Sequence, residues 1–184
     1  CFTSRDGARV LAAVADPSRL VRGAARKLVA LVCDDAQTLS ALQQTYAVRQ
    51  HLPILLALRH RGRQAPIDAF LTWLAERPDQ ARLAELLPLG SPALLDRLLP
   101  AALLRPSTLF WQRLAALAPE RLCRLLAEKL QEGSADAQWR WVLERWLPQL
   151  AAAVPVATCA VVDCLLAQGL TVEPRVIDRL IARC

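Results

Sequence analysis

Apolar residues recur along this chain at spacings of three and four positions, with polar residues between them. This period places apolar side chains on one side of a helix, so it predicts amphipathic helices. Residues 18–33 show the pattern clearly. We expect the inner side of this helix to consist of Val21, Ala25, Leu28 and Val32. The opposite side would carry Arg19, Arg22 and Arg26.

Glycine, proline and hydroxyl residues divide the pattern into short helices, because glycine favours the end of a helix and Ser, Thr or Pro its beginning. The residues expected as N-caps are Ser91, Ser107, Ser134 and Thr171. Two prolines, Pro100 and Pro148, fall inside predicted helices and should kink or split them. Twelve helices are predicted, over residues 6–15, 18–33, 35–45, 48–61, 66–76, 79–87, 92–104, 107–117, 119–131, 135–153, 156–168 and 173–182.

The connections between these helices are two to five residues long, and no strand is needed anywhere. Short connections make successive helices pack as antiparallel hairpins. The sequence therefore predicts an all-α protein, a right-handed α-solenoid of about six hairpins, with a compact helical bundle as the alternative. Because no linker or low-complexity tract interrupts residues 1–184, we expect one domain, a segment of a larger protein.

The stretch Asp16–Leu31 resembles the second helix of a HEAT repeat. That family has an Asp in the turn, then a Val-Arg pair, two small residues and a Leu. The matching residues are Asp16, Val21, Arg22, Ala24, Ala25 and Leu28. The resemblance covers about one repeat. It implies that Arg22 pairs with Asp16, or with an aspartate of an adjacent repeat, in a ladder that fixes how repeats stack.

Membrane and secreted classes do not suit this composition. The longest uncharged run, Trp146–Val162, has 17 residues and contains Pro148 and Pro155, whereas a membrane span needs about 20 apolar residues. Charged residues interrupt the first turns, where a secretory signal would need an apolar run. The six cysteines form no Cys-x-x-Cys pair and lie among apolar residues, which favours free thiols in the cytoplasm.

Catalytic signatures are also missing from the sequence. It has no phosphate-binding glycine loop, no His-Glu-x-x-His and no nucleophile elbow, and its histidines are His51 and His60 alone. The one adjacent carboxylate pair, Asp34 and Asp35, is better explained as a turn and helix N-cap than as a metal site. We therefore expect no catalytic residue, metal or cofactor.

The net charge of +6 lies entirely in the first third of the chain, because residues 1–63 hold ten Lys and Arg against four Asp and Glu. The basic candidates for partner binding are Arg19, Arg26, Lys27, Arg59, Arg61 and Arg63. Trp141 is a further candidate, because it lies off the predicted inner stripe of its helix, which consists of Trp139, Val142, Leu143, Trp146 and Leu150. The alternatives are a merely solvated face for the cations and a contact with the next repeat for Trp141.

Two functions remain open at this point. The first is a non-enzymatic scaffold for protein–protein interaction, whose partner has an acidic surface. The second is a nucleic-acid-binding module, because arginine suits bidentate contact with phosphate and the resemblance extends to HEAT-like DNA-repair glycosylases. Those enzymes need a catalytic Asp beside aromatic residues, and neither can be assigned in this sequence.

Overall fold

The computed structural model of the protein describes residues 4–104, 106–133 and 137–183. Its described part is all-α, as predicted, with twelve α-helices and one short 3-10 helix. The elements are α1 (Ser4–Ala13), α2 (Arg19–Val32), α3 (Asp35–Tyr46), α4 (Leu52–His60), α5 (Ala65–Ala75), α6 (Gln80–Leu86), η1 (Leu87–Leu89), α7 (Pro92–Ala102), α8 (Thr108–Leu117), α9 (Pro119–Gln131), α10 (Ala137–Ala153), α11 (Pro155–Ala167) and α12 (Pro174–Ile181).

Side-chain caps explain where several helices begin. The carboxylate of Asp34 accepts a hydrogen bond from the main-chain N–H of Gln37 at 2.8 Å, and the Gln37 side chain accepts from Asp34 N–H at 3.2 Å. This reciprocal pair is a capping box, so the cap predicted for Asp34 is confirmed. The hydroxyl groups of Ser91 and Ser107 likewise accept from the first turns of α7 and α8.

One expectation about helix boundaries is wrong, and a second is wrong as far as it concerns the splitting of helices. Thr171 does not cap α12, which begins at Pro174 with Glu173 as its N-cap residue. Pro100 and Pro148 do not split their helices, because α7 and α10 run through them. A proline removes one hydrogen bond from the ladder, and buried packing on both sides can hold a helix through it. The cap expected at Ser134 lies outside the described residues.

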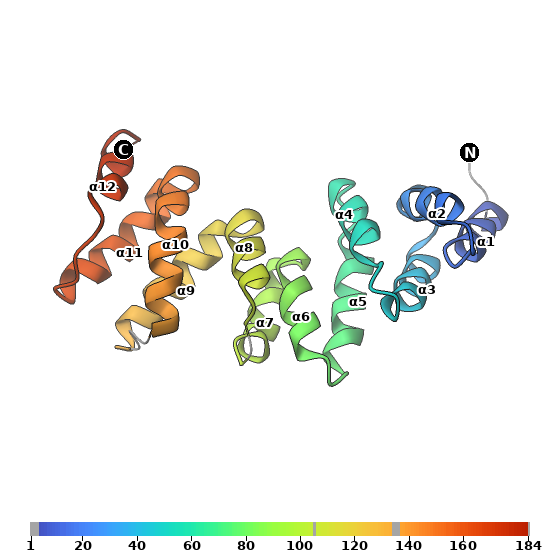
Figure 1. Cartoon of the computed structure of the whole chain (residues 1–184), viewed down its shortest axis with the longest axis horizontal. Helices are drawn as coiled ribbons and strands as arrows, with labels where there is room; N and C mark the ends of the chain where they lie inside the picture. The colour runs from blue at the N-terminus through green and yellow to red at the C-terminus, as the bar shows by residue number, and fades with distance from the viewer. Residues whose placement is uncertain (1–3, 105, 134–136, 184) are drawn as a thin grey trace. The chain divides into compact units, whose positions relative to one another are not determined.

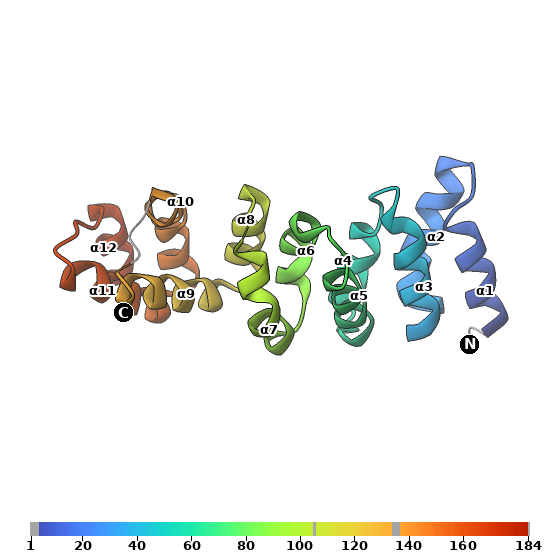
Figure 2. The ribbon, with the colours of Figure 1, turned by 90° about the horizontal axis from the view of Figure 1, so that it is seen from below.

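The chain divides into two compact units, residues 1–106 and residues 107–184. In the N-terminal unit the first helices pack against neighbours one or two places along the chain. Thus α1 contacts α2 and α3, α2 contacts α4, and α3 contacts α5. The antiparallel hairpin of α1 and α2 can be followed in Figure 1 and, from a perpendicular direction, in Figure 2. These contacts are those of stacked helical hairpins.

The C-terminal unit repeats this arrangement. Here α8 contacts α9 and α10, α9 contacts α11, and α10 contacts α12. Its core contains Trp111 and Trp139, whose rings meet edge to face with centroids 5.4 Å apart. The stripe predicted for α10 is confirmed, because Trp139, Val142, Leu143, Trp146 and Leu150 are all buried.

Hydrogen bonds from long side chains to helix-end carbonyl groups join successive hairpins. In the N-terminal unit, Nη1 of Arg63 donates to the carbonyl oxygens of Ala30 at 3.1 Å and Cys33 at 2.9 Å. Its Nη2 also forms an ion pair with Asp35. The last carbonyls of a helix have no partner within the helix, so Arg63 supplies the donors that the end of α2 lacks.

The same arrangement recurs in the C-terminal unit at a similar sequence distance. Arg179 donates to the carbonyl of Pro148, and Arg183 to that of Ala152, each 31 positions earlier and at 2.6 Å. The Gln168 side chain donates to the carbonyl of Leu130 at the end of α9. A spacing near 31 residues is about the length of one hairpin, so each donor reaches the hairpin that precedes its own.

Arg63→Met should therefore destabilise the protein. Methionine retains much of the aliphatic packing but leaves the carbonyls of Ala30 and Cys33 without their donor. We expect the free energy of unfolding to fall by about 1–2 kcal/mol in chemical denaturation, a reduced figure because Arg63 is 26% exposed. The matched control is Arg61→Met, two positions away and fully outside this contact, which should change stability by less than about 0.5 kcal/mol. Equal effects of the two substitutions would contradict the capping role.

Candidate functional site

Several of the basic residues singled out in the sequence are engaged within the chain. Arg63 caps the end of α2, and Nη1 of Arg59 donates to the carbonyls of Pro88 and Leu89 in η1 at 3.2 and 3.4 Å. Arg59 and Arg63 therefore stabilise the fold, because their guanidinium groups connect neighbouring hairpins. The remaining basic candidates are Arg19, Arg26, Lys27 and Arg61.

Arg22 and Asp16 meet, but not through a carboxylate–guanidinium pair. Nη1 of Arg22 donates to the carbonyl oxygens of Asp16 and Pro17, both at 2.7 Å. The carboxylate of Asp16 instead accepts from the main-chain N–H of Ser18 at 2.7 Å. The ladder implied by the HEAT resemblance is thus replaced here by a local contact, in which Arg22 closes the turn before its own helix.

Arg26 lies one helical turn beyond Arg22 and is half-buried. Its Nε and Nη2 atoms are enclosed and find no hydrogen-bond acceptor among the described residues. Burial, followed by the positive charge of Arg22, lowers the pKa of Arg26 below its ordinary value. The positive charge of Arg26 therefore lowers the free energy of unfolding instead of raising it.

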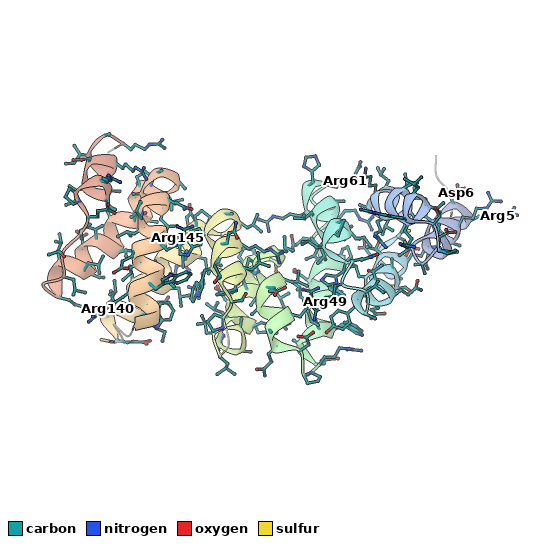
Figure 3. All side chains as sticks on the ribbon, viewed as in Figure 1. Arg5, Asp6, Arg49, Arg61, Arg140 and Arg145 are labelled. Atoms are coloured by element: carbon teal, nitrogen blue, oxygen red, sulfur yellow. The ribbon has the colours of Figure 1, made fainter. Side chains whose placement is uncertain are left out.

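Three basic candidates remain exposed, namely Arg19, Lys27 and Arg61. Arg19 and Lys27 belong to α2, and Arg61 lies at the carboxyl-terminal end of α4 (Figure 3). None of the three forms a hydrogen bond or ion pair with a residue in the described ranges. These are the cations that a partner could contact without breaking the fold.

An apolar stripe runs beside them on the exposed side of α2. We define the α2 stripe as Leu20, Ala24, Leu28 and Leu31, which follow one another at spacings of four, four and three. All four are exposed, Leu20 to 84% of its area. Successive spacings of this kind place the side chains on one side of the helix over three turns.

The inner side predicted for α2 is wrong at two of its four positions, while Ala25 is buried and Val32 half-buried. Val21 and Leu28 were expected to be buried, yet both are exposed, and the buried residues are Ala25, Val29 and Ala30. The helices α1 and α4 pack against α2 on the side that carries these small residues. Small side chains allow helix axes to approach closely, so packing selects that side and leaves the leucines outside.

Trp141 is exposed to 39%, whereas its neighbours Trp139 and Trp146 on α10 are buried. It forms a second apolar feature that the packed hairpins leave accessible, in the C-terminal unit. An exposed tryptophan is a frequent anchor at protein interfaces.

The C-terminal unit also contains a pocket that sequence reasoning missed. We call it the α10–α12 pocket. It has a volume of about 620 Å³ and is lined by Arg140, Leu143, Glu144, Leu147, Pro148, Leu165, Leu170, Thr171, Val172, Glu173, Pro174 and Val176. Its walls come from α10, the end of α11, the segment 170–173 and the start of α12. In the sequence, the stretch from Gly169 to Pro174 predicts a helix cap and does not reveal the pocket.

No group of three or more His, Cys, Asp or Glu side chains within the described ranges could hold a metal ion. Burial is the main reason why the pKa values of the Cys33 and Cys123 thiols are raised, which opposes formation of a reactive thiolate.

None of the helices in the described ranges is both long and apolar enough to cross a bilayer. No family model, curated protein or solved structure matches the chain. The HEAT resemblance at Asp16–Leu31 therefore stays a prediction.

The environment of Arg26 leads to a direct prediction. Arg26→Met removes a partly enclosed charge that has no acceptor and keeps a flexible apolar side chain in its place. We expect the free energy of unfolding to stay the same or to rise by up to about 1 kcal/mol. The comparison is Arg22→Met, which loses two hydrogen bonds to the turn and should cost about 1 kcal/mol. A loss of stability larger for Arg26→Met than for Arg22→Met would show that Arg26 has a stabilising partner.

Proposed function

We propose that this protein is a non-enzymatic scaffold of HEAT-like helical repeats that binds other proteins. The observation that carries the proposal is the α2 stripe. Large apolar side chains exposed in helical register are costly to leave in water, and contiguous apolar patches mark interaction sites. Free cysteines at four described positions support a cytoplasmic location, where thiols stay reduced.

The partner that fits this surface is an amphipathic helix with acidic residues beside its apolar face. A second helix can align its own apolar residues with Leu20, Leu28 and Leu31, because both follow the same period. Arg19 and Lys27 lie on the same helix and form no hydrogen bond or ion pair with a residue in the described ranges, so they can pair with carboxylates at the edge of the contact.

Nucleic acid remains the second candidate, and the free cations favour it to a limited extent. Arg19, Lys27 and Arg61 could each contact a phosphate. Several arginines that would extend such a surface, among them Arg59 and Arg63, donate to carbonyl groups instead. The apolar α2 stripe also offers nothing to a phosphate backbone.

Binding to a defined peptide tests the proposal. The probe is a fluorescein-labelled helical peptide of about 15 residues, with leucines along one face and glutamates beside them, long enough to cover α2. We expect fluorescence polarisation to show saturable binding. The double substitution Leu20→Asp with Leu31→Asp should weaken it about tenfold or more, because it places charge in the apolar contact.

The matched control is Val156→Asp, since Val156 is 81% exposed, almost as much as Leu20, but lies in the C-terminal unit. It should leave binding unchanged. An equal loss with Val156→Asp would show unspecific adhesion and contradict the proposal. Tight binding of duplex DNA that weakens steeply with salt, in place of peptide binding, would instead support the nucleic-acid function.

A further inference from the structure

The α10–α12 pocket has walls suited to an aliphatic side chain. Four of its lining residues are at most 7% exposed, namely Leu143, Leu147, Leu165 and Val176. No aromatic ring is among the lining residues, so stacking of a nucleobase or an aromatic ligand has no platform there. A volume of about 620 Å³ lies within the range of pockets that bury a sizeable ligand, roughly 300–1,000 Å³.

One wall of the pocket includes main-chain groups that form no hydrogen bond within the described ranges. The segment 170–173 joins α11 to α12 and has neither helical nor turn structure, as Figure 1 shows. The main-chain groups of Thr171 and Val172 form no hydrogen bond with any residue in the described ranges. Unpaired N–H and C=O groups along an irregular segment can pair with an added extended chain. Pro174 keeps the preceding residue, Glu173, in an extended conformation, so the end of the segment 170–173 stays extended.

The rim carries both signs of charge, with Arg140, Glu144 and Glu173 among the lining residues and the guanidinium of Arg175 beside Glu173. Glu144 and Arg140 lie one turn apart on α10, and neither forms an ion pair within the described ranges (Figure 3 labels Arg140). Glu173 is 4.0 Å from Arg175, with both side chains largely exposed, which is a weak contact. Glu144, which forms no ion pair within the described ranges, favours a basic group on the ligand next to its aliphatic part.

We propose that the α10–α12 pocket binds an extended peptide segment of a partner protein, with one aliphatic side chain inserted between α10 and α12 and a lysine or arginine beside it. The peptide main chain pairs with Thr171 and Val172. Its basic residue contacts Glu144 and Glu173 at the rim. This site is independent of the α2 stripe, so the protein would engage a partner through two different modes of recognition.

Three labelled octapeptides test this site. Each has a central Val-Leu-Val, flanked by lysines, glutamines or glutamates. Fluorescence polarisation should show the lysine peptide binding best and the glutamate peptide worst. Replacing the central leucine by glycine should abolish binding, because the pocket then loses its aliphatic occupant.

Protein variants separate this site from unspecific charge effects. Glu144→Lys together with Glu173→Lys should weaken the lysine peptide about tenfold, through the loss and reversal of two rim contacts. The control Asp163→Lys, an exposed carboxylate of α11 outside the pocket lining, should leave affinity unchanged. Circular dichroism of all variants checks that the helices persist; because all three positions are exposed, we expect no loss of helix.

Two results would overturn the proposal. One is the lysine peptide failing to bind, or binding the rim variant as well as the unaltered protein. The other is dodecanoate binding in the pocket while no peptide does, which would make it a site for an acyl chain. Neither result bears on the α2 stripe, since Leu20 and Leu31 lie in the other unit.

Discussion

The fold depends on how the open carbonyl groups at helix ends are satisfied. Every helix leaves about four of them without a partner, and a short helix has as many as a long one. The helices of this chain have 7 to 17 residues in the described ranges, so open carbonyls make up a large share of their polar groups. Arg63 and Arg183 reach back about one hairpin to supply donors to such carbonyl groups. Because donor and acceptor lie about one hairpin apart in the sequence, the length of a hairpin determines whether its arginine reaches the hairpin before it.

Helix positions were largely predictable from the sequence, because glycines, prolines and capping residues act locally. The capping box of Asp34 needs only residues three positions apart. The buried side of α2 was not predictable in the same way. Val21 and Leu28 obey a helical period as well as Ala25 and Val29 do, so the period alone cannot choose between the two sides. The close approach of α1 and α4, which small residues permit, decides it.

The candidate sites were less predictable than the fold, because charge in a sequence does not reveal what accepts it. Arg59 and Arg61 differ by two positions, yet Arg59 donates to carbonyls of η1, whereas Arg61 forms no hydrogen bond or ion pair with a residue in the described ranges. The α10–α12 pocket joins residues of α10 to a segment about thirty positions later along the chain. Such a pocket arises only from tertiary packing, and the local signal at Thr171 pointed to a cap instead.

The capping of helix ends by arginine also affects how the packing between helices depends on pH. A ladder of aspartates and arginines loses its attraction when acid protonates the carboxylates. The carbonyl oxygens of Pro148 and Ala152 do not titrate, and a guanidinium group stays protonated at any physiological pH. The two hydrogen bonds that these arginines donate to α10 therefore join groups whose charge states are constant. Acidification of the surroundings removes neither the donor nor the acceptor of these bonds.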